Sequence, residues 1–421
     1  MKILLKSVKI FDNTSKYHLK KMDILIESGI VKEIAKSITP SEAYQVVQEQ
    51  GIGISPAWMD TNFHIFEPGH EYREDFKSGL NAAQNAGFSK LCLMPNTFPP
   101  MDNSTQLAFA QQAGKQSMVD VLSLGAISQG LKGKDIAEIY DMYQHGAIAF
   151  TDGSHSMLDA GLMERALWYV KKFDGLVMSN PDNEDISLKG QMNEGVNSTL
   201  LGLEGVPKLA EELMVSRDIY LLEHTDSRLH FTNISTKKSV DLIRKAKKKG
   251  LNVSASVNVA NLMFDDSEVL SYDTNFKVKP HLREQEDVIA LLKGLADNTI
   301  DLIASGHIPL HIDEKKVEFE NAEFGMSTID CTFQAARTVT CEILDEEQLI
   351  DKFLKGYELL NQNRPSLAVG EKADYTVFQM DGTSEFQVTD IHSKGKNNPF
   401  VGKELMGAVI GVIKGNKTNI S

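Results

Sequence analysis

The sequence contains few cysteines, and their spacing does not suggest a metal or redox site. Cys92, Cys331 and Cys341 are the three cysteines among 421 residues, and none belongs to a Cys-x-x-Cys motif. Zinc ribbons, disulfide-rich scaffolds and dithiol redox centres need numerous or closely spaced cysteines. We therefore exclude these classes and interpret the three thiols as reduced core residues of a cytoplasmic protein.

Positive charge is also scarce. Lysine and arginine number 44 against 58 aspartates and glutamates, which gives a formal net charge of −14. Such a surface repels polyanions, so we expect neither nucleic acid nor an anionic membrane as a partner. No apolar run approaches the roughly 20 residues of a membrane-spanning helix, and charges interrupt residues 1–23, unlike a signal peptide.

Three common functional motifs are missing as well. The chain has no Gly-x-Ser-x-Gly elbow, no phosphate-binding Gly-x-x-x-x-Gly-Lys-[Ser/Thr] loop and no His-Glu-x-x-His helix. The lysine-rich stretch 244–249 is interpreted as a solvated helix end, where positive charge is favourable, rather than as an anion site.

What the sequence does contain is a regular alternation of short apolar strands and helical stretches. Alternation of this kind predicts an α/β fold with a parallel sheet, and a closed (β/α)8 barrel over residues 57–365 is the expected form. The predicted strands are 91–94, 119–126, 147–151, 176–179, 219–223, 229–233, 253–257 and 302–305. The predicted helices are 75–86, 157–172, 206–216, 238–249 and 284–297.

The two ends of the chain have a different pattern. Residues 3–11, 22–26 and 31–34 alternate like strands and are separated by turn residues, and 373–379 and 405–413 read the same way. We expect residues 1–56 and 366–421 to pack together as one composite β-sandwich domain.

Polar clusters follow the first two predicted strands of the central region. Residues 60–69 contain Asp60, His64 and Glu67-Pro68-Gly69, and the next strand ends in Met94-Pro95-Asn96-Thr97. This stretch resembles the dihydroorotase branch of the amidohydrolase superfamily, with its pattern Asp-x-His-x-His-x-Arg-Glu-Pro-Gly followed by Met-Pro-Asn-Thr. Further matches in the same order lie at 193–195, 202–207, 228–236, 272–283, 370–374 and 398–400.

The resemblance implies a barrel enzyme that hydrolyses or closes a cyclic amide with zinc, but the metal-binding positions are largely changed. His64 and Asp152 are retained, and Asp182 stands where the family has a histidine. Three other ligand positions hold Asn62, Asn233 and Gly306, while His230 could replace one ligand only with different geometry. Amide oxygen suits hard cations better than zinc, and glycine offers no ligand. We therefore expect no zinc centre and no other cofactor.

The substrate-binding positions are changed in the same way. Phe66 stands where the family has an arginine for the substrate carboxylate, and Lys279 replaces an asparagine. Asn96 is retained, either as a substrate contact or for the geometry of its turn. An aromatic ring cannot provide the bidentate grip that a carboxylate needs.

Three functional hypotheses follow. The first is a catalytically silent dihydroorotase homologue that acts as a structural partner of aspartate transcarbamoylase, as the resemblance suggests, or that self-associates. The second is an active dihydroorotase, or another cyclic-amide hydrolase, with a zinc ion held by His64, Asp152 and Asp182. The third is a metabolite-binding module with Phe66 and Lys279 as new contacts.

Overall fold

A closed barrel of parallel strands forms the centre of the computed structural model, which describes residues 1–115 and 117–420. The staves pair in the order β6-β7-β8, then β9-β12-β13-β14, and bridges from Phe150 to Gly125 and Val177 join the two groups. A bridge between Phe63 and His307 closes the ring. The named staves are β6 (Trp58–Phe63), β7 (Phe88–Leu93), β8 (Asp120–Ser123), β9 (Val177–Ser179), β12 (Leu229–Phe231), β13 (Val253–Asn258) and β14 (Leu302–Ala304). The predicted α/β barrel is confirmed.

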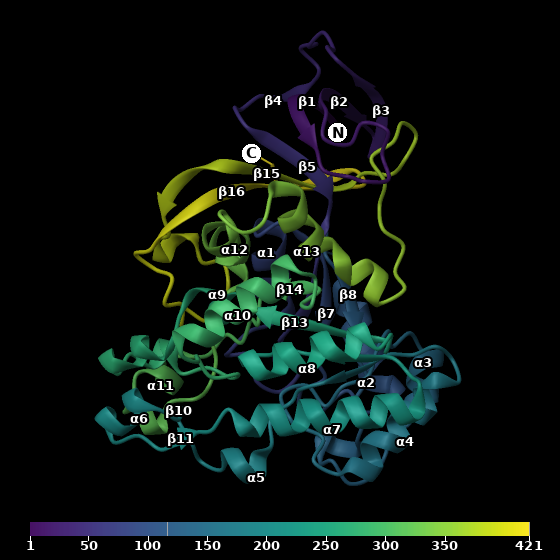
Figure 1. Cartoon of the computed structure of the whole chain (residues 1–421). Helices are drawn as coiled ribbons and strands as arrows, with labels where there is room; N and C mark the ends of the chain where they lie inside the picture. The colour runs from purple at the N-terminus through teal and green to yellow at the C-terminus, as the bar shows by residue number, and fades with distance from the viewer. Residues whose placement is uncertain (116, 421) are drawn as a thin grey trace.

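Helices surround the barrel and connect its staves (Figure 1). They are α1 (Phe76–Asn85), α2 (Ser104–Gly114), α3 (Ile139–Gln144), α4 (Ala160–Lys171), α7 (Leu209–Thr225), α8 (Lys237–Lys248), α10 (Gln285–Ala296), α12 (Thr332–Thr340) and α13 (Glu346–Leu359). Asp75 caps α1 by accepting a hydrogen bond from the Ser78 amide.

The predicted strand 147–151 is reduced to isolated bridges at Phe150, and the predicted strand 219–223 is wrong. Residues 219–223 lie in the last turns of α7. Ile219, Leu221 and Leu222 form a short apolar run, and such a run does not by itself distinguish a buried strand from a helix. Here the helix that begins at Leu209 continues through it to Thr225.

Short elements collect at one end of the barrel, around the carboxyl ends of its strands. Figure 1 shows α6 (Val196–Leu201), β10 (Met192–Asn193), β11 (Gly205–Val206) and α11 (Ile312–Lys315) together on this side. The remaining connections are α5 (Glu184–Ser187), α9 (Val259–Met263), η1 (Gln129–Leu131), η2 (Asp266–Ser271), η3 (Thr274–Phe276), η4 (Phe319–Asn321), η5 (Ile329–Cys331) and η6 (Val388–Asp390).

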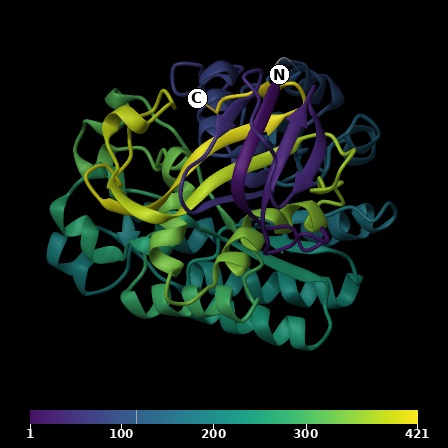
Figure 2. The same ribbon diagram turned by 90° about the horizontal axis from the view of Figure 1, so that it is seen from above.

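Strands from both termini form a single mixed sheet of eight strands. β5 pairs with β1 in parallel and with β15 antiparallel, which joins the two ends of the chain. Figure 2 shows these amino-terminal strands crossing the yellow carboxyl-terminal ones. The strands are β1 (Lys2–Ile10), β2 (Lys21–Glu27), β3 (Ile30–Ala35), β4 (Gln45–Val47), β5 (Ile52–Pro56), β15 (Asp374–Glu385), β16 (Glu404–Lys414) and β17 (Lys417–Thr418).

An aromatic cluster fastens this sheet to the barrel. The Trp58 ring of β6 lies 4.8 Å from Phe333 of α12, 5.1 Å from Phe353 of α13 and 5.3 Å from Phe378 of β15. All four side chains are buried, and each aromatic pair adds about 0.5–1.5 kcal/mol beyond its buried area. The cluster therefore holds the terminal sheet firmly against the barrel.

Within the described part of the chain, no helix is long and apolar enough to cross a membrane.

Candidate functional site

A small polar cavity lies at the carboxyl ends of the barrel strands, and we call it the mouth cavity. Its volume is about 40 Å³, well below the roughly 300–1,000 Å³ of typical ligand pockets. Four asparagines from four different strand ends line it, together with one histidine: Asn62, Asn180, Asn233, Asn258 and His64. Gly306, Lys279, Pro280 and Ile308 are also among its walls.

His64 is the one imidazole lining the mouth cavity. Its side chain is buried and stacks on Phe66, with ring centroids 6.0 Å apart. Burial, reinforced by His307, lowers the pKa of His64 to about 3. The ring is therefore neutral at physiological pH, as a metal ligand must be, but a single neutral imidazole makes no metal centre.

Asp152 is turned away from the mouth cavity. Its Oδ1 accepts hydrogen bonds from the amides of Ile127 (2.8 Å) and Ser128 (2.9 Å), and its Oδ2 accepts one from the Ser128 hydroxyl. Burial raises the pKa of Asp152 despite these bonds. Its carboxylate holds the loop after β8 in place, and both oxygens are already engaged.

Asp182 pairs with Lys279 instead of meeting His64. The Lys279 Nζ lies 3.3 Å from Oδ2 of Asp182, while the Ser187 hydroxyl donates to Oδ1. Lys279 also lies over the Phe324 ring, 5.3 Å from its centroid. The structure therefore does not bring together the three side chains predicted as metal ligands.

Asn96 supports the backbone around Gly153. Its Nδ2 donates to the carbonyl of Asp152 (3.3 Å), and its Oδ1 accepts from the amide of Ser154 (3.2 Å). Gly153 has φ +65°, and a Cβ there would lie 1.7 Å from the Asn96 Oδ1. The amide thus occupies space that only glycine leaves open, so the geometry favours the structural interpretation of this retained residue.

Gly306 and Asn258 fit together in a similar way. Gly306 has φ +63°, and a Cβ at this position would lie 2.4 Å from both Cγ and Oδ1 of Asn258. Asn258 is buried, with 6% of its surface exposed, and its Oδ1 has no hydrogen-bond partner among the described residues. Asn258 therefore fills the place next to the glycine where the family has its aspartate.

Phe66 is not in the wall of the mouth cavity; it stacks on His64, which is, and Arg73 covers the Phe66 ring. The Arg73 guanidinium lies over the Phe66 ring, 5.2 Å from its centroid, and pairs with Glu314 at 2.5 Å. Arg73 therefore does not replace the missing substrate-binding arginine, because its donors already face Glu314.

Asn233, two residues after the end of β12, lines the mouth cavity, whereas His230 on β12 does not. Asn233 has φ +57°, and its amide donates to the Ser256 hydroxyl (3.1 Å). The His230 ring is fully buried between the hydroxyls of Ser254 (2.8 Å) and Ser256 (3.1 Å) of β13. His230 is a core residue here and does not take over the ligand position.

The buried His230 predicts a specific loss of stability in acid. Burial, with a contribution from Lys247, lowers the pKa of His230 to about 3 from its ordinary 6.5. Between these values the unfolded chain binds a proton that the folded chain does not, so the unfolding free energy falls by about 1.4 kcal/mol per pH unit as pH drops below 6.5. We expect urea unfolding of His230→Gln at pH 7.5, 6 and 5 to lack this part of the slope.

The control for this prediction is His224→Gln, at a ring that is 64% exposed. It is expected to keep the pH slope of the unsubstituted protein. Equal slopes for the two variants would show that the buried His230 ring binds its proton as readily in the folded chain as in the unfolded chain.

The residues present at the mouth do not fit zinc. Zinc needs three or four imidazole, thiolate or carboxylate ligands that converge on one point. Among the described residues, such ligand atoms come within 4.8 Å of one another in one group of three: Glu284, Glu286 and Asp287. Lys208 binds this group, with its Nζ 2.6 Å from both Glu284 and Asp287, so it forms an ion-pair cluster.

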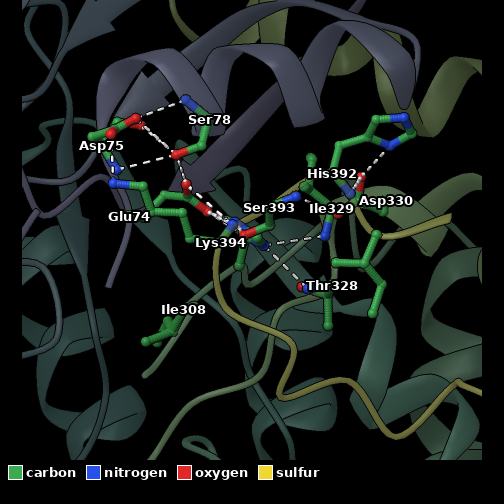
Figure 3. A network of polar contacts seen from close by, with 12 residues as sticks. Glu74, Asp75, Ser78, Ile308, Thr328, Ile329, Asp330, His392, Ser393 and Lys394 are labelled. Carbon is green, nitrogen blue, oxygen red and sulfur yellow. Dashed lines mark hydrogen bonds and ion pairs between the residues drawn. The ribbon is translucent and has the colours of Figure 1, made fainter. Parts of the chain in front are cut away.

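A buried network behind the mouth explains the role of the histidine after Gly306. His307 is fully buried, its Nδ1 accepts from the amide of Thr328 (3.1 Å), and its Nε2 lies 3.7 Å from Glu74. Glu74 also accepts from the hydroxyls of Ser78 and Ser393. Figure 3 shows Glu74 between Ser78 of α1 and the segment that carries Ser393 and Lys394. The network joins the barrel to the carboxyl-terminal segment.

Arg283 organises the loops on the opposite side of the mouth. It is buried and donates to Oδ1 of Asn193 (3.0 Å), the carbonyl of Val206 (2.9 Å) and the Ser235 hydroxyl (3.1 Å). Glu211 accepts hydrogen bonds from the amides of Ser235 and Thr236, both at 3.0 Å. These contacts bring together four of the segments that the sequence analysis matched separately: 193–195, 202–207, 228–236 and 272–283.

The sequence analysis did not single out Asn258, and it passed over Asn180. Asn258 directly follows the predicted strand 253–257, and Asn180 follows 176–179. A polar residue at the end of a barrel strand points to the mouth, so the same rule that selected Asn62 could have found both.

Comparison with known proteins agrees with this architecture. Residues 52–239 match a family model described as Dihydro-orotase-like. A dihydroorotase from Caldicellulosiruptor saccharolyticus is 40% identical over 425 residues, covering 99% of this chain and 97% of that protein. One from Thermoanaerobacter sp. is 38% identical over 395 residues, covering 92% and 90%. The solved L-hydantoinase (dihydropyrimidinase) from Arthrobacter aurescens is 21% identical, with TM-score 0.85 over 99% of this chain and 95% of that one.

Proposed function

This chain belongs to the dihydroorotase family, and we propose that it is a catalytically silent member whose barrel mouth no longer assembles a zinc centre. The observation that carries the proposal is the set of side chains lining the mouth cavity, which has four asparagines and a single imidazole. The fold of the family is kept, while the residues that would hold its metal are replaced. Fold and activity are thus separable in this chain.

The chemical requirements of cyclic-amide hydrolysis support the proposal, because the residues at the mouth do not supply the groups that the reaction needs. The reaction needs a Lewis acid and a hydroxide at neutral pH, which zinc supplies in metallohydrolases. It also needs a group that carries a proton, and Gly306 has none. A carboxylate substrate needs a cationic grip, where this chain has the Phe66 ring covered by Arg73. The small volume of the mouth cavity also leaves little room for a substrate ring.

The role we propose for the retained scaffold is structural. Aspartate transcarbamoylase is the partner that the family resemblance suggests, in pyrimidine synthesis in the cytoplasm, and a second copy of the chain is the alternative. Helix α6 presents Val196 and Leu200, one turn apart and each 72% exposed, as a surface that an assembly could cover. Light scattering of the chain alone and mixed with the transcarbamoylase of the same organism distinguishes the two.

Metal content and turnover test the central proposal. The purified chain, incubated with excess zinc and desalted, is expected to retain far less than one zinc per chain. It is expected to interconvert N-carbamoyl-L-aspartate and dihydroorotate no faster than buffer does. The variant His64→Ala should give the same two results, because the single imidazole holds no metal.

The opposite result would support an active enzyme with zinc on His64, Asp152 and Asp182. Stoichiometric zinc together with turnover, both lost in His64→Ala, would overturn the silent-homologue proposal. That outcome would require Asp152 to leave its bonds to Ile127 and Ser128.

A metabolite-binding module is the second candidate, and Lys279 is the observation that favours it. This side chain is 40% exposed and lines the mouth cavity, where a charged donor could meet a ligand. Saturable binding of a metabolite without metal, lost in Lys279→Met, would favour this candidate over a purely structural role.

A further inference from the structure

A second cavity, which we call the junction cavity, lies where the terminal sheet meets the barrel. Its volume is about 210 Å³, and its lining includes Phe11, His18, Asn298, Glu347, Lys352 and Arg364. His18 lies in the loop between β1 and β2, and Asn298 lies between α10 and β14, before that strand begins. Figure 1 shows α13, which forms one wall, between the terminal sheet and the barrel. The junction cavity is therefore at the opposite end of the barrel from the mouth.

Two polar side chains in the lining of the junction cavity are held in place and keep part of their surface open. The Arg364 side chain is 21% exposed, and its Nη2 donates to Oδ1 of Asp12 (3.3 Å). The His18 side chain is 24% exposed, and its Nε2 bonds Oε1 of Glu347 (3.0 Å). A group that is already fixed and partly exposed can meet a ligand with little ordering cost.

A buried ammonium also belongs to the lining of the junction cavity. Lys352 is 3% exposed, and its Nζ donates to Oδ1 of Asn298 (2.8 Å) and to the carbonyl of Ile300 (3.1 Å). An ammonium has three N–H donors, so one remains for a ligand. Burial lowers the pKa of Lys352 to about 8, which leaves the group mostly protonated at pH 7.

The charges around the junction cavity are balanced. Two cations, Lys352 and Arg364, face it together with two carboxylates, Glu347 and Asp351. The rest of the lining is partly apolar and buried: Phe11, Leu295, Leu344, Ile350 and Leu354. Such a lining suits a small zwitterion with an apolar part, because a purely anionic or purely cationic ligand would meet charges of its own sign.

We propose that the junction cavity binds a free amino acid with an apolar side chain. The carboxylate of the amino acid pairs with the Arg364 guanidinium and lies next to Lys352. Its ammonium group pairs with the carboxylates of Glu347 and Asp351. The apolar side chain packs on the buried wall. This inference is independent of what happens at the mouth.

Calorimetric titration of the full chain with L-leucine at pH 7.5 tests the proposal. Two analogues isolate the charges: 4-methylpentanoate lacks the ammonium group, and 3-methylbutylamine lacks the carboxylate. Each is expected to bind at least about tenfold more weakly than leucine, the loss of one hydrogen bond to a charged group. No saturable binding of leucine, or equal affinity for leucine and either analogue, would overturn the proposal.

Variants locate the binding site. Glu347→Gln, at a half-exposed side chain, and Arg364→Met are each expected to weaken leucine binding by about tenfold. Lys355→Met, on the same helix but paired with Glu358 outside the lining, is the matched control and should leave affinity unchanged. Asn62→Ala at the mouth should leave it unchanged too. Loss of binding in Asn62→Ala, with Glu347→Gln unaffected, would place the ligand at the mouth and refute the junction site.

Discussion

Glu74→Ala is expected to lower the unfolding free energy by about 3–5 kcal/mol, the cost of removing one member of a buried charged network. The Glu74 carboxylate is fully buried and accepts from Ser78, Ser393 and the amide of Lys394. Its removal leaves these donors unsatisfied and leaves His307 without the acceptor that its Nε2 faces. Urea denaturation followed by circular dichroism measures the loss.

Two further variants make this prediction specific. Glu71→Ala, three residues earlier and exposed, is expected to cost no more than a few tenths of a kcal/mol, about the usual effect of a surface substitution. Glu74→Gln keeps the shape and one acceptor oxygen, so it should fall between the two. If Glu74→Ala were as stable as Glu71→Ala, the network would contribute nothing to the attachment of the carboxyl-terminal segment.

Gly306→Asp, which puts back the residue type that the family has at this position, is expected to destabilise the protein without restoring zinc. The new Cβ would lie 2.4 Å from Asn258, and overpacking of this kind costs about 1–3 kcal/mol. The positive φ of 63° adds backbone strain for a residue with a side chain. The restored carboxylate would still find amides at Asn62 and Asn233 instead of imidazoles.

The strain and the crowding can be measured separately. Gly202 has a similar φ of +68° and no atom within 4 Å of a built Cβ, so Gly202→Asp carries the backbone cost alone. The additional loss in Gly306→Asp should disappear in the double variant with Asn258→Ala. Equal stability of Gly306→Asp and Gly202→Asp, or zinc bound by Gly306→Asp, would contradict the packing of Asn258 described above.

Much of the fold could be predicted because strand and helix periods repeat along the chain. Residues 253–257 alternate apolar residues with serine, residues 302–304 are a short apolar run closed by Ser305, and both segments are barrel staves in the structure. The prediction of a strand at 219–223 was wrong because the run Ile219 to Leu222 is too short to show a period, and the helix α7 that precedes it continues through it. The register between the amino-terminal and carboxyl-terminal strands could not be predicted from the sequence either, because the pairing of β5 with β15 joins residues more than 300 positions apart.

The site could be predicted only in part. Loss of imidazoles is visible at Asn62 and Asn233, because residue types at motif positions can be read directly. The direction of a side chain cannot, and Asp152 illustrates this: its position predicts a ligand, but its carboxylate satisfies the amides of a neighbouring loop. Asn258 was overlooked because its side chain fills the space next to Gly306, which lies 48 positions away in the chain but is its neighbour in the fold.

The amides around the mouth have one wider consequence. Imidazoles and carboxylates grouped at a barrel mouth repel or compete for protons until a cation joins them, so such a protein depends on its metal supply to be complete. Asparagine does not titrate, and the His64 ring stays neutral down to a pKa of about 3. On the proposed function this barrel needs no cation to complete its mouth, and we expect its shape to be the same in zinc-starved and zinc-replete cells.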